Sequence, residues 1–342
     1  MTTENQLPAE NQTTIAGDVT SGGDFVARDK TIHGDEIGGD KVGGNKIAPQ
    51  GYVAIGGQTV HVHLGSPDPS AFSFAKEAPS EDKSPYQGLN YFSFEDAHLF
   101  FGREQLTAEL AGYLRTHHFL AVVGASGSGK SSLVRAGLIP ALHYGEPLAD
   151  GTMPPENSQH WPIHIMQPKA HPLRELAATL MRDSESDLEH IKLEDELAQD
   201  ARVLDRRVSR LLSGGPADRL LLVVDQFEEL FTLCKDQTER KVFVDNLLTA
   251  AVEDGVTTVV ITLRADFYAH CFSFENLRTA LGDYQIPIGP MSKDELRRAI
   301  EEPAKFGKWE LEPGLVDLLL DDVGDEPGAL PLLSHALLET WK

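Results

Sequence analysis

The stretch that decides the fold is "FLAVVGASGSGKSSL", residues 119–133. Its apolar start predicts a buried strand, the Gly- and Ser-rich middle predicts a loop, and a helical pattern begins at Lys130. Gly124, Gly129, Lys130 and Ser131 match G-x-x-x-x-G-K-[ST] in the strand–loop–helix context of a phosphate-binding loop. Glycines let backbone N–H groups surround a phosphate, and the helix N-terminus adds a positive dipole end. The stretch therefore predicts a nucleoside triphosphate site.

Within this loop we expect Lys130 to reach the β- and γ-phosphates and the Ser131 hydroxyl to be a ligand of Mg²⁺. The loop also supplies most of the nucleotide contacts that the sequence predicts, namely Gly124, Ala125, Ser126, Gly127, Ser128, Gly129, Lys130, Ser131 and Ser132.

A second motif is the apolar run "LLLVVD", residues 220–225, which ends in an acidic residue. Asp225 ends this predicted strand, where a carboxylate can hold Mg²⁺ through water, with Ser131 as the other metal-binding residue. Glu228 and Glu229 come soon after and are candidates for the general base that polarises the attacking water. Of the two we favour Glu229. Acidic residues are also favoured at a helix start by the dipole alone, so a structural role for this pair stays open.

The strand pattern "TTVVITLR" (257–264) ends in Arg264. If this strand lies between the phosphate-loop strand and the Asp225 strand, Arg264 points at the γ-phosphate and can sense its presence. The alternative is a surface arginine at a strand end. The predicted catalytic residues are thus Lys130, Asp225, Glu228, Glu229 and Arg264.

Strand and helix patterns alternate along most of the chain. This alternation predicts an α/β fold of the P-loop type, with a parallel sheet covered by helices on both faces. We expect the core to span 85–290 and a small helical lid to span 291–342, incomplete at its C-terminus and followed by further domains. The expected strands cover 119–124, 161–168, 220–225, 257–264 and 284–289, and the expected helices 130–142, 172–183, 187–212, 239–255, 292–303, 312–324 and 331–342.

Residues 1–66 differ in composition from the rest and are rich in Gly and Asp. Ile32, Ile37, Val42 and Ile47 recur every five residues, which predicts pentapeptide-like β repeats. One coil of such repeats has no neighbour on which to bury its apolar side. The segment is therefore either a flexible arm or an assembly segment that stacks on copies from other chains. Residues 67–84, rich in Pro, Ser and charge, are a predicted linker.

The composition excludes several classes of protein. The chain has 342 residues and a net charge of -23, which argues against non-specific binding to nucleic acid or anionic membranes. Cys234 and Cys271 lack the spacing of a metal site or a disulfide framework, so a reducing compartment fits best. The apolar runs are too short to span a membrane. We expect a cytoplasmic protein without a membrane partner.

One tetrapeptide, "LSGG" (212–215), resembles the signature of transporter ATPases. Pro216 stands where that signature usually has Gln, and too few residues separate Gly215 from Asp225 for the usual intervening helix. We interpret the stretch as a turn between a helix and a strand.

Several motifs in order resemble the STAND class of signalling ATPases, specifically the novel STAND NTPases. They are "SPYQGLNYFSFEDAHLFFGREQLTAEL" (84–110), the phosphate loop, "LLLVVDQFEELF", "VVITLRADFY" and "GALPLLSHAL". The resemblance implies that Gly102, Arg103 and Glu104 lie near the adenine and ribose. It also implies that Pro331 packs near the base and that Arg264 is the first sensor arginine.

The resemblance further implies a working cycle. The protein holds ADP at rest, exchanges it for ATP, and associates with copies of itself, with residues 1–66 as the output arm. Slow Mg²⁺-dependent hydrolysis then resets it, so the implied cofactors are ATP or ADP and Mg²⁺. The activating stimulus is not implied. Two alternatives stay open: a continuously cycling remodelling ATPase of the AAA+ type, and an assembly scaffold that nucleotide only stabilises.

Overall fold

The computed structural model describes residues 84–182, 184–323 and 329–341. The predicted arm (1–66) and nearly all of the predicted linker (67–84) lie outside these residues. The pentapeptide-like repeats therefore stay a prediction.

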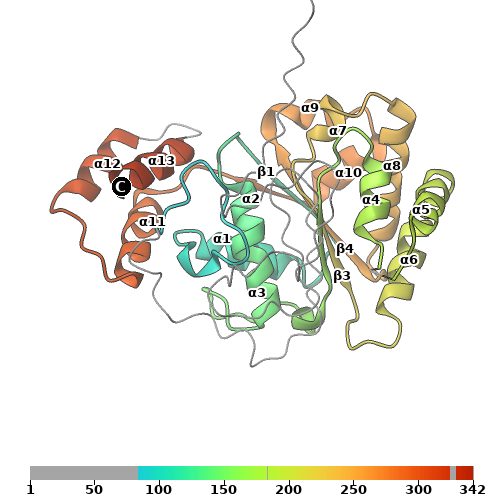
Figure 1. Cartoon of the computed structure of the whole chain (residues 1–342), viewed down its shortest axis with the longest axis horizontal. Coiled ribbons are helices and arrows are strands. Elements are labelled where there is room, and N and C mark those ends of the chain that lie inside the picture. The colour runs from blue at the N-terminus through green and yellow to red at the C-terminus, as the bar shows by residue number, and fades with distance from the viewer. Residues whose placement is uncertain (1–83, 183, 324–328, 342) are drawn as a thin grey trace, which may run out of the picture. The chain divides into compact units, whose positions relative to one another are not determined.

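A five-stranded sheet forms the centre of the described chain, with strand order β2-β3-β4-β1-β5 (Figure 1). All of its pairings are parallel. The order puts β4 between β1 and β3, as the expectation for Arg264 required, and Arg264 pairs with Gly124. The strands are β1 (Phe119–Gly124), β2 (Ile163–Met166), β3 (Leu220–Val224), β4 (Thr257–Arg264) and β5 (Gln285–Ile288).

Both faces of this sheet are covered by helices, as predicted. Side chains alternate along each strand: Leu120 and Leu221 pack in the core on one face, and Ala121 and Leu222 in the core on the other. Figure 1 shows α1, α2 and α3 on one side of the sheet and α4 to α10 on the opposite side. Burial on both faces explains why the strands read as continuous apolar runs rather than as alternating ones.

The helices on the first side are α1 (Glu104–Tyr113), α2 (Lys130–Ser132) and α3 (Ile139–Tyr144). Those on the other side are α4 (Pro172–Thr179), α5 (Asp187–Gln199), α6 (Val203–Leu212), α7 (Glu229–Thr232), α8 (Gln237–Ala250), α9 (Tyr268–Cys271) and α10 (Glu275–Asp283). The short 3-10 turns are η1 (Ala97–Leu99), η3 (Ser158–His160) and η4 (Ala265–Phe267).

The helix after the phosphate loop is not uniform, although we predicted one helix over 130–142. A π-helical segment, η2 (Leu133–Leu138), separates α2 from α3, and the Ile139 N–H donates to the Val134 carbonyl. Pro140 follows directly and has no N–H with which to continue the ordinary ladder. Such π-helical turns occur mostly as short bulges inside α-helices and are frequent at functional sites.

Two further differences concern the elements of the second side. The predicted polar helix 187–212 is two helices, α5 and α6, with a break after Gln199. The "LSGG" stretch is a turn, as interpreted, with Gly214 at a φ of 84° and the Gly215 N–H donating to the Leu212 carbonyl over 3.1 Å.

The predicted helical lid consists of α11 (Lys293–Phe306), α12 (Leu315–Val323) and α13 (Ala329–Trp341). It has an apolar core of its own, to which Tyr86 from the start of the described chain also belongs. The buried members are Tyr86, Leu296, Ile300, Leu320, Leu333 and Leu337. Within the described ranges, no helix is both long and apolar enough to cross a membrane.

Candidate nucleotide-binding site

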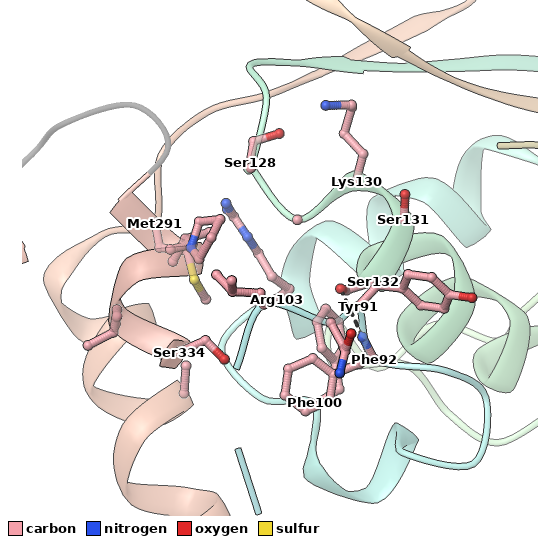
Figure 2. Close-up of a pocket in the computed structure, with 18 of the residues that line it drawn as sticks. Tyr91, Phe92, Phe100, Arg103, Ser128, Lys130, Ser131, Ser132, Met291 and Ser334 are labelled. Carbon is pink, nitrogen blue, oxygen red and sulfur yellow. Dashed lines mark hydrogen bonds between the residues drawn. The ribbon is translucent and has the colours of Figure 1, made fainter. Parts of the chain in front are cut away.

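A pocket of about 340 Å³ lies where the phosphate loop, the segment before α1 and the lid helix α13 meet (Figure 2). The loop gives it a polar end, and aromatic and aliphatic side chains give it an apolar wall, as in many cofactor sites. Its lining includes Tyr91, Phe92, Phe100, Arg103, the run 126–132, Gln226, Glu228, Thr262, Arg264, Met291, Pro331 and Ser334.

Two glycines shape the phosphate loop. A Cβ at Gly124 would lie 2.7 Å from the Ser128 hydroxyl oxygen and 3.1 Å from the Ile288 carbonyl oxygen, so a side chain there would crowd the loop and β5. Gly129 has a φ of 86°, which places it in the left-handed region that favours glycine. The Ser128 hydroxyl is buried without a hydrogen-bond partner among the described residues. A phosphate oxygen would satisfy it.

Lys130 lies at the polar end of the pocket and is nearly buried. Its Nζ donates to the carbonyl oxygens of Gly124 and Ala125, over 3.1 and 2.7 Å. Burial lowers the pKa of Lys130, while the nearby carboxylate of Glu228 opposes that shift. The side chain is thus a cation held inside the loop, as recognition of phosphate requires.

Asp225 is held by donors on both of its carboxylate oxygens, and 1% of its side chain is exposed. Oδ1 accepts from the hydroxyls of Ser131 and Thr262, over 2.8 and 2.7 Å, and from the Gln226 N–H over 3.1 Å. Oδ2 accepts from Arg135 Nε over 3.0 Å.

The oxygens of Ser131 and Asp225 fit Mg²⁺, which prefers hard oxygen ligands. This ion usually takes one or two protein ligands and completes its octahedron with phosphate and water. The described ranges contain no group of three or more His, Cys, Asp or Glu that could hold a metal without such help. The Ser131 hydroxyl and the Asp225 carboxylate are hydrogen-bonded to each other, so they lie close enough to share one ion with a bound nucleotide.

The two glutamates after Asp225 point to different places. Glu228 lines the pocket, and its Oε2 accepts from the Arg264 N–H over 3.3 Å. Glu229 is absent from the lining, and its Oε2 accepts from the Lys169 N–H over 3.2 Å. Burial raises the pKa of Glu229. Of the two glutamates, Glu228 lines the pocket and Glu229, which we favoured, does not.

Arg264 lies at the rim of the pocket. Its Nε and Nη2 donate to the two carboxylate oxygens of Asp266, over 3.1 and 2.6 Å. Its guanidinium carbon also lies 5.3 Å from the ring centroid of Phe267. The predicted sensor arginine is therefore engaged by an aspartate two residues further along, a partner that we did not predict.

Some residues of the "FFGRE" motif line the pocket, and others contact the lid. Arg103 lines the pocket and donates from Nη2 to the Gly289 carbonyl over 2.8 Å. Gly102 lines no part of the pocket, and a Cβ there would overlap the carbonyl oxygen of Glu295 in α11. Glu104 also faces α11, where it accepts from Arg298 over 2.9 Å. The implied contact with nucleotide thus has geometric support for Arg103, whereas Gly102 and Glu104 join the core to the lid.

Pro331 lines the pocket together with Leu330 and Ser334 of α13. Ser126 to Ser132 line it from the phosphate loop, while Gly124 and Ala125 are not part of the lining.

The sequence interpretation missed Phe92, Thr262 and Arg135. The Phe92 N–H donates over 3.1 Å to Oγ of the predicted Ser132, a contact that holds an aromatic segment against the phosphate helix. Thr262 and Arg135 both contact Asp225. Arg135 had a visible signal, because it is a charged residue within the apolar run "LVRAGL".

A phosphate loop between a central strand and its helix, facing a carboxylate at the end of another strand, defines a P-loop NTPase. The family model for Novel STAND NTPase 1 matches residues 85–342. The chain belongs to this family, which confirms the resemblance.

Solved structures of similar proteins were also found, whereas a comparison with curated proteins returned no match. A Walker-type ATPase of Pyrococcus abyssi has 13% identity and a TM-score of 0.49, over 74% of this chain and 71% of that one. The ORC2 protein of Aeropyrum pernix has 15% identity and a TM-score of 0.48, over 69% of this chain and 61% of that one. Domain III of the replication initiation protein DnaA of Thermotoga maritima has 13% identity and a TM-score of 0.43, over 72% of this chain and 86% of that one. The chain thus spans less than two thirds of the length of ORC2.

Proposed function

We propose that this chain is an ATP-binding signalling switch. It holds ADP at rest, exchanges it for ATP when a stimulus opens the lid, associates with copies of itself, and is reset by slow hydrolysis. One observation carries the proposal: the phosphate loop, Arg264 and the lid residues Pro331 and Ser334 line the same pocket. A nucleotide in that pocket contacts both the proposed catalytic residues and the lid helix α13, which has to move.

Different residues contact different parts of the nucleotide. The phosphates lie on the loop at Gly124–Gly129, with Lys130 beside the β- and γ-phosphates. Ser131 and Asp225 hold Mg²⁺, which when bound neutralises charge on the phosphate oxygens. The base and ribose occupy the apolar part, near Arg103 and Pro331. The pocket's polar end and apolar wall support this orientation.

Hydrolysis uses Glu228 as the general base. Its carboxylate takes a proton from the water that attacks the γ-phosphorus, and the bond to the bridging oxygen breaks to leave ADP and phosphate. Lys130 and Arg264 stabilise the charge that develops on the phosphate oxygens. Glu228 is engaged by the Arg264 N–H and Arg264 by Asp266. Because both groups must rearrange before they act, slow turnover follows.

The lid reports the state of the nucleotide through contacts with the core. Leu330 of α13 faces Gly129, so that a Cβ at Gly129 would lie 4.0 Å from the Leu330 Cδ1 atom. The ion pairs Arg103–Glu295 and Glu104–Arg298 hold α11 to the start of α1. A ligand shifts such an equilibrium only by its differential affinity for the two states. We infer that ADP favours the closed lid and that the extra phosphate favours the open one.

The partners in this proposal are ATP or ADP, Mg²⁺, an unidentified stimulus and further copies of the chain. The output role of residues 1–66 rests on the five-residue register alone, since they lie outside the described residues.

The test measures ATP turnover together with the molecular mass of the chain in ADP and in a non-hydrolysable ATP analogue. Lys130→Ala is the control. We expect turnover far below the typical enzyme value of about 10 s⁻¹, and a larger mass only in the analogue. Turnover at or above that value, with the same molecular mass in ADP and in the analogue, would favour a continuously cycling ATPase. No turnover and no effect of nucleotide on mass would favour a scaffold.

A further inference from the structure

Arg135 belongs to the phosphate helix but has no role in the nucleotide contacts described above. It lies in the π-helical segment η2, and 12% of its side chain is exposed. Its Nε donates to Asp225 Oδ2 over 3.0 Å. A cation therefore contacts the carboxylate that holds Mg²⁺ in the proposed function.

The two oxygens of Asp225 are in different situations. Oδ1 is fixed by Ser131, Thr262 and the Gln226 N–H, so these contacts alone orient the carboxylate. Oδ2 has Arg135 as its donor. Because an unpaired charge in a buried place is costly, the main contribution of Arg135 is to compensate the charge of Asp225 rather than to orient it.

A second contact keeps Arg135 in this place. Its guanidinium carbon lies 4.7 Å from the ring centroid of Tyr91, within the range of a cation–π interaction. The neighbouring Phe92 is fastened to the same helix by Ser132. Arg135 is thus confined between the metal-holding carboxylate and the aromatic wall of the pocket.

We propose that Arg135 sets the Mg²⁺ affinity of this site by acting through Asp225. Its positive charge neutralises Asp225 and opposes a second cation at the same carboxylate. Mg²⁺ therefore binds with the phosphates of a nucleotide, which supply the negative charge that Arg135 has cancelled, and only weakly without them. This inference rests on the proposed function, because it assumes that Asp225 and Ser131 hold Mg²⁺ beside a nucleotide.

The experiment titrates the binding of the fluorescent analogue mant-ADP to the whole chain at a series of MgCl₂ concentrations and in EDTA. Arg135→Met removes the charge at similar length, and Arg135→Gln removes it but keeps a donor for Asp225. For both variants we expect the MgCl₂ concentration at half-maximal effect to fall by on the order of tenfold, as the loss of a nearby like charge predicts. Binding in EDTA should change much less.

Two further variants separate charge from structure. Arg135→Lys retains the cation, so its Mg²⁺ dependence should stay close to that of the unaltered chain. Arg278→Met removes an exposed arginine of α10 and should change nothing. If Arg135→Met does not fold, Arg135→Gln alone decides the matter, because it still fills the hydrogen bond.

An unchanged or higher MgCl₂ requirement in the uncharged variants would overturn the inference, as would an Arg135→Lys variant that behaves like them. In either case Mg²⁺-dependent binding by the unaltered chain would leave the proposed function standing. If the unaltered chain bound mant-ADP without any effect of Mg²⁺, or did not bind it, the proposed function would fail and this inference with it.

Discussion

At the scale of single residues, backbone strain gathers where β3 ends. Gln226 has a φ of 54°, in the left-handed region that costs a residue with a side chain roughly 1–2 kcal/mol. The conformation turns its N–H toward Asp225 Oδ1 and toward Thr262 Oγ1, which accepts over 2.9 Å. Strain of this kind persists where the surroundings over-determine it, which is common at functional sites.

A substitution at Gln226 tests that strain. Gln226→Val places a β-branched side chain in the left-handed region and should lower the free energy of unfolding by about 2 kcal/mol. Gln226→Gly adopts the conformation freely and should not lower it. Urea unfolding of both variants measures the difference, and equal stability of the two would contradict the account.

The choice between the two glutamates is also a matter of single residues. Glu228→Gln should slow ATP hydrolysis by about 10²-fold or more, as removal of a general base does, while nucleotide binding is retained. Glu229→Gln should hydrolyse ATP nearly as fast as the unaltered chain, because its side chain faces Lys169 instead of the pocket. Single-turnover assays of the two variants decide between them. The reverse order of rates would restore Glu229 as the base.

At this scale, the sequence allowed prediction of the residues whose roles depend on a spaced motif. Lys130, Ser131 and Asp225 belong to such motifs, and the structure brings them together. Arg135 and Asp266 were not predicted, since their importance comes from a contact that only the packed chain creates. The orientation of Glu228 relative to Glu229 depends on the turn at Gln226, which the sequence does not signal.

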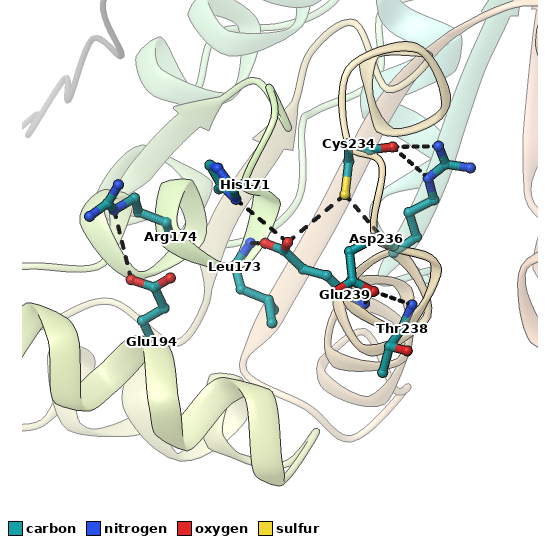
Figure 3. A network of polar contacts seen from close by, with 9 residues as sticks. His171, Leu173, Arg174, Glu194, Cys234, Asp236, Thr238 and Glu239 are labelled. Carbon is teal, nitrogen blue, oxygen red and sulfur yellow. Dashed lines mark hydrogen bonds and ion pairs between the residues drawn. The ribbon is translucent and has the colours of Figure 1, made fainter.

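At the scale of elements, the start of α8 carries a polar network that joins it to α4 (Figure 3). Glu239 Oε1 accepts from the Leu173 N–H over 3.3 Å, and Oε2 lies 3.7 Å from His171 Nδ1. The Cys234 thiol lies 4.0 Å from the same Oε2. Burial raises the pKa of Cys234. The group of Cys, His and Glu thus stabilises two helix starts and does not present a thiolate.

The cap of α8 gives a prediction at this scale. The Asp236 side chain accepts from the N–H groups of Thr238 and Glu239, over 2.8 and 3.2 Å. Asp236→Ala should therefore lower the free energy of unfolding by about 1 kcal/mol, and Asp236→Asn by much less. Thermal and urea unfolding measure both. A cap that contributes nothing would leave the two variants equal to the unaltered chain.

Elements were predictable where one physical signal dominates. The five strands are short apolar runs buried on both faces, and each was expected within a few residues of its bounds. Helices α1 and α10 were missed, and neither begins with a side-chain cap that would have marked its start. The interruption at η2 was missed because Pro140 lies near the end of an otherwise helical pattern.

At the scale of the whole molecule, the lid meets the core at the motif before α1. Gly102 has a φ of 89° and lies against Glu295 and Met291 of the lid side, where a Cβ does not fit. The ion pairs Arg103–Glu295 and Glu104–Arg298 flank it. The Glu104–Arg298 pair is partly exposed, and such pairs contribute little. The close approach at Gly102 should therefore contribute to the docking of the lid together with the more buried Arg103–Glu295 pair.

Gly102→Ala tests this contact. The added methyl group should loosen the lid and weaken ADP binding by on the order of tenfold, the effect of about 1.4 kcal/mol. Gly282→Ala is the matched control, since Gly282 lies in α10 with nothing within 4 Å of an added Cβ. Calorimetric titration with ADP measures both. Unweakened binding by Gly102→Ala would mean that the docking of the lid does not depend on this approach.

The central claim is that the molecule is a switch that holds its nucleotide. The most direct measurement denatures the purified chain and identifies the released nucleotide by chromatography, with Lys130→Ala as the control. The account predicts near-stoichiometric ADP from the unaltered chain and none from the variant. An empty site that turns over added ATP at about 10 s⁻¹, the typical enzyme value, would contradict it.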